Sequence, residues 1–223
     1  MTICQIFVKF VLNFNKFENL NLCVLASGRG SNLKSIIRSQ KSGKISSKVA
    51  IVISNKSNSG ALNIAKSYQI PNFHLSQKMF TSENEYVNNF FELLRNYDID
   101  LIVLAGYMKL IPVDIVKKFK NRIINIHPAL IPSFCGKGLY GLKVHEAVLN
   151  YGAKVTGVTV HLVDEEYDTG PIVLQKTLKV KDDDTPESLQ KRVLKWEHKM
   201  YPEAIKLFES KKFNIEGRKV FFT

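Results

Sequence analysis

The sequence predicts one α/β domain with an open, mostly parallel, twisted sheet, helices on both faces, and a C-terminal antiparallel hairpin and long helix. Short continuous apolar runs, typical of strands buried on both faces, are separated by helical patterns. Strands that alternate with helices in this way form parallel sheets. After residue 150 the pattern changes to two longer strands joined by a polar turn, which indicates a hairpin.

Each element follows from its own pattern, in chain order. Strands are expected over 22–26, 49–53, 72–75, 101–105 and 123–126, with helices after the first, second, third and fourth of them. The hairpin strands are expected over 155–163 and 172–180. Thr185 is a candidate N-cap, with Pro186 in the first helical position and Glu187 near the positive end of the helix dipole. The apolar residues of this last helix recur every three or four positions and predict core packing: Leu189, Val193, Trp196 and Met200.

Length and composition fit an ordinary globular protein. The chain has 223 residues, 45% of them hydrophobic and 23% charged, with no apolar run long enough to cross a membrane. We expect one domain over 21–215, preceded by an N-terminal extension over 1–20 without the features of a signal peptide. Three scattered cysteines favour a reducing, cytoplasmic setting over a disulfide framework or a Cys-rich zinc site.

The charge is unevenly placed. The formal net charge is +12, and the stretch 19–82 supplies nine Lys or Arg without one Asp or Glu. A basic segment suits nucleic acid, anionic lipid or a phosphorylated ligand. The excess of Lys over Arg is also typical of chains from AT-rich genomes, so the total charge by itself does not identify a partner.

A glycine-rich turn follows the first expected strand. Free backbone N–H groups at the start of the next helix favour an anion there, and glycine lets the backbone approach it closely. Leu33 stands where a dinucleotide fingerprint needs a third glycine, and no Walker lysine follows. A phosphomonoester is therefore the expected ligand, and a plain tight turn is the alternative. The candidate residues are Gly28, Arg29, Gly30, Ser31 and Asn32.

Asn125 and His127 lie on one face at the end of a buried strand, because strand side chains alternate with period two. The carboxyl ends of parallel strands line the binding crevice of such sheets. Asn can donate to a developing oxyanion, and His moves protons near neutral pH. An acid of the turn 164–168 is expected to orient His127. His145 and His161 lack ligand spacing to His127, so no metal is expected.

Four motifs in order resemble the folate-dependent phosphoribosylglycinamide formyltransferases, whose fold is Rossmann-like. They are LASGRGSNL (25–33), INIHPALIP (124–132), GVTVHLVDEEYDTGPIVLQ (157–175) and EHKMYP (197–202). The resemblance covers about residues 21–210. It implies transfer of a formyl group from 10-formyltetrahydrofolate, without a metal, to the amine of glycinamide ribonucleotide in purine biosynthesis.

The resemblance also implies residue roles. Asn125, His127 and Asp168 match the catalytic trio, in which Asp168 keeps His127 charged and Asn125 and His127 stabilise the oxyanion. Gly30, Ser31 and Asn32 would hold the ribonucleotide phosphate, and Glu197 would approach its ribose hydroxyls. Gly28 and Arg29 complete the implied substrate-binding residues. The implied folate-binding residues are Met108, Lys109, Leu110, Ile111, Asp164, Glu165, Tyr167 and Asp168.

The chain departs from the family pattern at two positions. Leu194 stands where many relatives have a basic or polar residue near the phosphate, and Glu83 lies where many have an arginine near the folate tail. The resemblance therefore predicts neither a phosphate contact from Leu194 nor a folate-tail contact from Glu83.

Two alternatives remain. A formyltetrahydrofolate deformylase shares the Asn, His and Asp residues, but such an enzyme is expected to have a further N-terminal domain and a second His where this chain has Pro128. A basic nucleic-acid-binding module would need interleaved aromatic and basic residues on one surface. We expect small-molecule substrates, no nucleic acid or membrane partner, and a monomer or homodimer.

Overall fold

The computed structural model describes residues 19–210 and 213–222, so nearly all of the expected extension over 1–20 lies outside the described residues. The strands are β1 (Asn21–Leu25), β2 (Lys48–Ser54), β3 (Asn72–His74), β4 (Leu101–Leu104), β5 (Ile123–His127), β6 (Val155–Leu162), β7 (Ile172–Lys179), β8 (Phe213–Glu216) and β9 (Lys219–Phe222). The helices are α1 (Ser31–Lys41), α2 (Gly60–Ser67), α3 (Glu83–Asn96), α4 (Val113–Lys118), α5 (Leu142–Asn150) and α6 (Pro186–Ser210), with a 3-10 turn at Gln77–Met79.

All of these strands join one sheet in the order β3-β2-β1-β4-β5-β6-β7-β9-β8. Strands β1 to β5 pair in parallel, and β6 runs antiparallel to both β5 and β7. The chain moves outward from β1 to β3 and then returns to place β4 on the other side of β1. This reversal between β1 and β4 is where open α/β sheets bind ligands.

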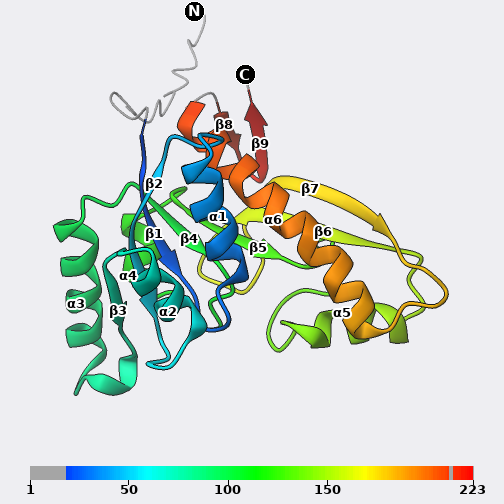
Figure 1. The fold of residues 1–223 in the computed structure, drawn as a ribbon, viewed down its shortest axis with the longest axis horizontal. Helices are drawn as coiled ribbons and strands as arrows, with labels where there is room; N and C mark the ends of the chain where they lie inside the picture. The colour runs from blue at the N-terminus through cyan, green and yellow to red at the C-terminus, as the bar shows by residue number, and fades with distance from the viewer. Residues whose placement is uncertain (1–18, 211–212, 223) are drawn as a thin grey trace, which may run out of the picture.

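Helices cover both faces of the sheet, and each face has its own apolar core. One core joins the α1, α2 and α6 side chains to Leu22 and Val24 of β1. The other joins those of α3 and α4 to Cys23 and Leu25, which point the opposite way. Figure 1 shows α1 and α6 crossing the same face side by side, and the two helices pack together. The predicted fold class is confirmed.

The last long helix begins as predicted and packs against the sheet centre. Thr185 Oγ1 accepts a hydrogen bond from the Ser188 N–H at 3.2 Å, which caps the helix. The buried Tyr201 O–H donates to the Leu104 carbonyl at 2.8 Å, which ties α6 to the end of β4. No helix within 19–210 or 213–222 is both long and apolar enough to cross a membrane.

Two parts of the fold had no counterpart among the predicted elements. Helix α5 follows a glycine-containing loop and buries only a short face at Val144, His145 and Val148. Strands β8 and β9 form a hairpin that turns at Gly217, whose φ is +60°. The expected domain end at residue 215 falls inside β8, and the sheet continues to Phe222.

Candidate active site

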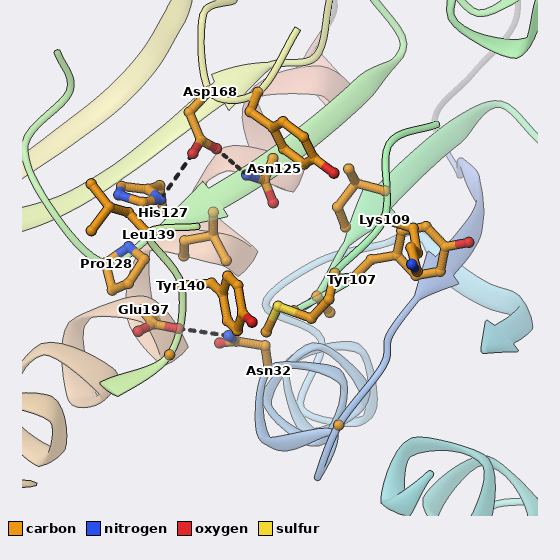
Figure 2. A pocket seen from close by; sticks show the side chains of 18 of the residues that line it. Asn32, Tyr107, Lys109, Asn125, His127, Pro128, Leu139, Tyr140, Asp168 and Glu197 are labelled. Atoms are coloured by element: carbon orange, nitrogen blue, oxygen red, sulfur yellow. Dashed lines mark hydrogen bonds and ion pairs between the residues drawn. The ribbon is translucent and has the colours of Figure 1, made fainter. Parts of the chain in front are cut away.

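One cavity of about 580 Å³ opens at the carboxyl ends of β1, β4 and β5. Figure 2 shows Asp168 beside His127 and Asn125 on one side of this pocket, with Asn32 and Glu197 on the other. The cavity lining includes all the candidate phosphate, ribose and catalytic residues: Gly28, Arg29, Gly30, Ser31, Asn32, Glu197, Asn125, His127 and Asp168. Residues 169 positions apart in the sequence therefore meet in one site.

The glycine-rich turn forms the start of α1. Gly30 is the N-cap with φ +77°, and a Cβ there would lie 2.8 Å from the Ala61 Cα. Only glycine fits this conformation and this approach without strain. The N-cap makes no side-chain hydrogen bond, so the first N–H groups of α1 remain available to an anion.

A buried hydrogen bond links this turn to α6. The Asn32 amide Nδ2 donates to Glu197 Oε2 at 2.7 Å, and Glu197 is only 9% exposed. Burial raises the pKa of Glu197, and the Asn32 hydrogen bond acts against that rise. The pair therefore fixes the turn against the carboxyl group that faces the cavity from α6.

Ser27 ties the loop after β1 to the loop after β4. Its N–H donates to the Gly106 carbonyl at 3.0 Å, and its hydroxyl accepts from the Met108 N–H at 2.8 Å. The Ser27 hydroxyl in turn donates to Asn55 Oδ1 at 2.6 Å. These bonds hold the second loop along the cavity, where its candidate folate-binding residues all line the wall: Met108, Lys109, Leu110 and Ile111.

Asp168 is the centre of the candidate catalytic cluster. Its Oδ2 lies 3.5 Å from His127 Nδ1 and accepts a hydrogen bond from the Gly136 N–H at 3.0 Å. Its Oδ1 accepts from the Asn125 amide at 3.1 Å. The other ring nitrogen of His127, Nε2, lies 2.8 Å from the Phe134 carbonyl oxygen. Both His127 nitrogens therefore face oxygen acceptors.

Burial and charge act against each other at this cluster. Burial lowers the pKa of His127, and the Asp168 carboxylate and Phe134 carbonyl raise it only in part. Burial alone would raise the pKa of Asp168, but hydrogen bonds and charge from His161, His127 and the Gly136 N–H bring it below its ordinary value. Burial therefore favours a neutral His127 beside an ionised Asp168 at neutral pH, whereas the resemblance implies a charged His127.

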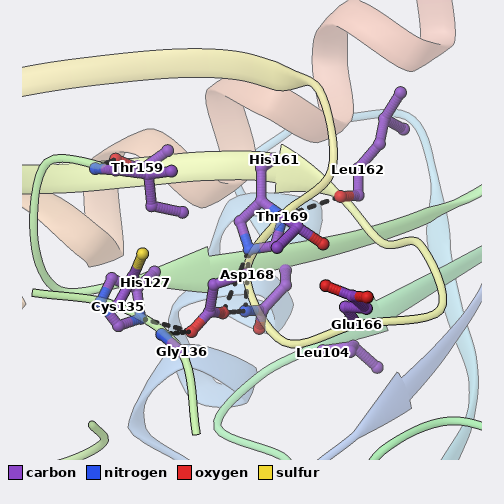
Figure 3. A network of polar contacts seen from close by, with 12 residues as sticks. Leu104, His127, Cys135, Gly136, Thr159, His161, Leu162, Glu166, Asp168 and Thr169 are labelled. Atoms are coloured by element: carbon purple, nitrogen blue, oxygen red, sulfur yellow. Dashed lines mark hydrogen bonds and ion pairs between the residues drawn. The ribbon is translucent and has the colours of Figure 1, made fainter. Parts of the chain in front are cut away.

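His161 belongs to the same cluster, although its sequence spacing predicts neither a metal site nor a place beside Asn125. Its Nε2 lies 3.1 Å from the Asn125 amide nitrogen and 3.4 Å from Asp168 Oδ1, and its Nδ1 lies 2.7 Å from the Leu162 carbonyl oxygen. Figure 3 shows His161 and Asp168 facing each other. Asn125 and His161 are directly opposite in the β5–β6 pairing, so the register of that strand pair is the signal that identifies His161.

The turn between β6 and β7 places the Asp168 side chain in the cavity wall. Asp168 has φ +58°, and a Cβ at Gly170 would lie 1.8 Å from the Leu162 carbonyl oxygen. Tyr167 lines the cavity as expected, whereas Asp164 and Glu165 do not. Asp164 instead accepts a 2.6 Å hydrogen bond from the Thr169 hydroxyl within the turn. Besides Asp168, the acid of this turn that lines the wall is Glu166.

The described residues contain no group of three or more His, Cys, Asp or Glu side chains that could hold a metal ion. The cluster offers instead an ionised carboxylate, a neutral imidazole and an oriented amide beside an anion-binding helix start. This combination suits acyl transfer to an amine carried by a phosphorylated molecule.

Known proteins with the same organisation include curated relatives from plants and bacteria. The chain is 46% identical over 185 residues to the chloroplastic phosphoribosylglycinamide formyltransferase of Arabidopsis thaliana, which covers 82% of this chain and 63% of that protein. It is 37% identical over 183 residues to the phosphoribosylglycinamide formyltransferase of Bacillus subtilis, covering 82% and 91%. The chain thus spans less than two thirds of the length of the plant relative.

Solved structures of similar fold include proteins with the same name as these relatives. Glycinamide ribonucleotide transformylase 1 from Symbiobacterium toebii superposes with a TM-score of 0.86 at 38% identity, covering 93% of this chain and 95% of that one. A formyltetrahydrofolate deformylase from Pseudomonas syringae superposes with a TM-score of 0.81 at 23% identity, a likeness of fold alone. A family model described as formyl transferase matches residues 20–205. The chain belongs to the formyl transferase family.

Proposed function

We propose that this protein transfers the formyl group of 10-formyltetrahydrofolate to the amine of glycinamide ribonucleotide, a step of purine biosynthesis. One observation carries the proposal. A single cavity joins an uncapped, glycine-rich helix start, suited to a phosphate, to a cluster of Asn125, His127 and Asp168, suited to acyl chemistry. The names of the plant and bacterial relatives support the same reaction.

The ribonucleotide binds along the α1 side of the cavity. Its phosphate accepts hydrogen bonds from the N–H groups of Gly30, Ser31 and Asn32, and the positive end of the α1 dipole favours its charge. Glu197 accepts from the ribose hydroxyls. The glycinamide amine then points toward the end of β5. This orientation turns a reaction between two molecules into one between groups already held in place.

Formyl transfer then proceeds by addition and elimination. The amine nitrogen attacks the formyl carbon, and the carbonyl electron pair moves to oxygen to form a tetrahedral oxyanion. The oxyanion re-forms the carbonyl as the bond to N10 of the folate breaks, and a proton passes from the attacking nitrogen to N10. The products are formylglycinamide ribonucleotide and tetrahydrofolate, so atoms and charge balance.

His127 handles the proton in this scheme. Its neutral form, favoured by burial, accepts a proton as the amine attacks, and Asp168, 3.5 Å from Nδ1, stabilises the resulting imidazolium. The imidazolium then stabilises the oxyanion and returns the proton toward N10, directly or through a water held near Asp168. The charged ring is therefore a form reached during the reaction and not the resting form.

Asn125 is prepared to donate to the oxyanion. One N–H of its amide is held by ionised Asp168, and the other faces His161 Nε2 at 3.1 Å. His161 is itself held in place, because its Nδ1 lies 2.7 Å from the Leu162 carbonyl oxygen. The oxyanion accepts a hydrogen bond from this second N–H while Asp168 keeps the amide oriented.

The folate cosubstrate occupies the other side of the cavity. The apolar surface there comes from Met108, Leu110 and Ile111, and the backbone of the loop offers polar groups to the pterin. Folate contacts from Asp164 and Glu165 are not part of this proposal because neither residue lines the cavity.

The cytoplasm is our proposed compartment, because scattered free cysteines suit a reducing environment. The plant relative is named chloroplastic, so fluorescence microscopy of the tagged full chain is the appropriate test.

A monomer or a homodimer, without nucleic acid, is proposed as the working form. Analytical sedimentation of the purified chain measures its oligomeric state.

The test of function is a cosubstrate-dependence assay. The purified chain is mixed with 10-formyltetrahydrofolate, and tetrahydrofolate release is followed with and without glycinamide ribonucleotide. We expect release only when the ribonucleotide is present. Release at the same rate without it would indicate a deformylase, and no release under either condition would reject both activities.

A further inference from the structure

His145 is a buried histidine of the cavity that the proposed mechanism does not use. It lies on α5, is only 1% exposed, and lines the same cavity as His127 and Glu197. Its Nδ1 is buried without a hydrogen-bond partner among the described residues. A buried polar atom left unpaired costs free energy, so a purely structural role would be served as well by an apolar side chain.

The ring presents one defined polar atom to the cavity. Because Nδ1 is sealed inside the protein, the nitrogen left to face the cavity is Nε2. Burial, together with the charge of His127, lowers the pKa of His145 to about 4, so the ring is neutral near pH 7. The tautomer with the proton on Nε2 avoids burying an unpaired N–H and gives the cavity a neutral donor.

The position of His145 indicates what this donor meets. Helix α5 packs against α6, the helix that carries Glu197, and His145 is close enough to His127 to be affected by its charge. The side chain therefore lies on the part of the wall shared by the ribose-facing carboxylate and the reacting centre. A ribonucleotide that spans these two points places ribose and amide oxygens, all acceptors, along this wall.

We propose that His145 is a further substrate-binding residue, which donates a hydrogen bond from Nε2 to an oxygen of the ribonucleotide between its phosphate and its reacting amine. This inference rests on the proposed function. It assigns to His145 a contact with the ribonucleotide and none with the folate.

Substitutions of His145 distinguish a role in ribonucleotide binding from a role in packing. His145→Phe keeps a ring of similar size and removes both nitrogens, while His145→Gln keeps an amide N–H close to the position of Nε2. His145→Asn places its amide near Nδ1 and too far back to reach the cavity. His198→Phe is the matched control, because His198 Nε2 is also buried without a partner but the residue does not line the cavity.

The measurement is calorimetric titration of glycinamide ribonucleotide into each full-length variant without folate. We expect the Kd to rise about ten-fold for His145→Phe and His145→Asn, with His145→Gln closer to the wild type. His198→Phe stays within about two-fold of the wild type. The melting temperature of ligand-free His145→Phe is expected to equal or exceed that of the wild type, because an unpaired buried nitrogen is removed.

Two results would overturn the inference while leaving the proposed function intact: wild-type affinity in both His145→Phe and His145→Asn, or equal losses in His145→Gln and His145→Phe. The Asn and Gln pair decides the matter if the Phe variant does not fold. A wild-type protein that binds no ribonucleotide would instead reject the proposed function.

Discussion

The two sides of the cavity are built in different ways. The proposed phosphate side is one continuous segment, 28–32, whose donors would be backbone N–H groups set by Gly30 and the start of α1. The chemical side is assembled from β5, the 134–136 loop, β6 and the turn after β6, all converging on Asp168. The first side depends on local backbone conformation and the second on tertiary contacts. We therefore expect substitutions in the two sides to differ in their effects on kcat, ribonucleotide affinity and stability.

The largest effect is expected at Asp168. Asp168→Asn preserves size but removes the charge that stabilises a protonated His127, so kcat for formyl transfer should fall by about 10³-fold. Ribonucleotide affinity should change little, because the phosphate side is untouched. Stopped-flow assays and calorimetry on the same preparation measure both. Asp182→Asn, at an exposed position, serves as control, and a parallel loss of affinity would contradict the division between the two sides.

His161→Phe tests whether formyl transfer depends on His161, the member of the Asp168 cluster that the sequence did not predict. The variant loses the contacts of His161 Nε2 with Asn125 and Asp168. A misplaced amide and carboxylate should lower kcat by about 10²-fold with a nearly unchanged KM. His161→Gln, which offers an amide near Nε2, should recover part of the loss. Equal activity in all three proteins would show that His161 is only a packed core residue.

The pH profile distinguishes the resting form of His127. Burial holds its pKa below the ordinary value of 6.5, so the neutral ring is present at neutral pH and is lost as the pH falls through that lowered pKa. We expect kcat/KM to be level near pH 7 and to fall by about ten-fold per pH unit below the pKa. If activity rose on acidification, the charged ring would be the form required at the start.

Gly30→Ala gives the smallest change and probes the phosphate side alone. The new Cβ would occupy a left-handed conformation 2.8 Å from the Ala61 Cα, at a cost of about 1–2 kcal/mol in the free energy of unfolding. Urea denaturation measures this cost. Gly28→Ala is the stability control, because its Cβ would meet nothing within 4 Å. Equal stability of the two variants would show that the turn tolerates a side chain.

The same difference explains what the sequence could predict. The buried strands were predictable because apolar runs such as Leu101–Leu104 contain no polar interruption. The phosphate turn was equally accessible, since its residues are contiguous. Helix α5 and the β8–β9 hairpin were not, because short apolar faces and short alternating strands give weak periodic signals.

The chemical side was predictable only in part. Asn125 and His127 share one strand end, but His161 enters through the register of the β5–β6 pair. Phe134 and Gly136 contribute backbone atoms, which carry no residue-type signal. Asp164 was expected at the folate and instead stabilises its own turn, because the turn conformation decides which of several acids faces the cavity.

In the proposed reaction, the two sides of the cavity act together on one formyl group. The most direct measurement uses 10-formyltetrahydrofolate labelled with ¹³C at the formyl carbon and follows that carbon by NMR in the presence of glycinamide ribonucleotide. We predict that the label appears in the N-formyl group of the ribonucleotide, with one tetrahydrofolate formed for each. Label recovered as free formate would show that the protein hydrolyses the formyl donor and does not transfer its formyl group.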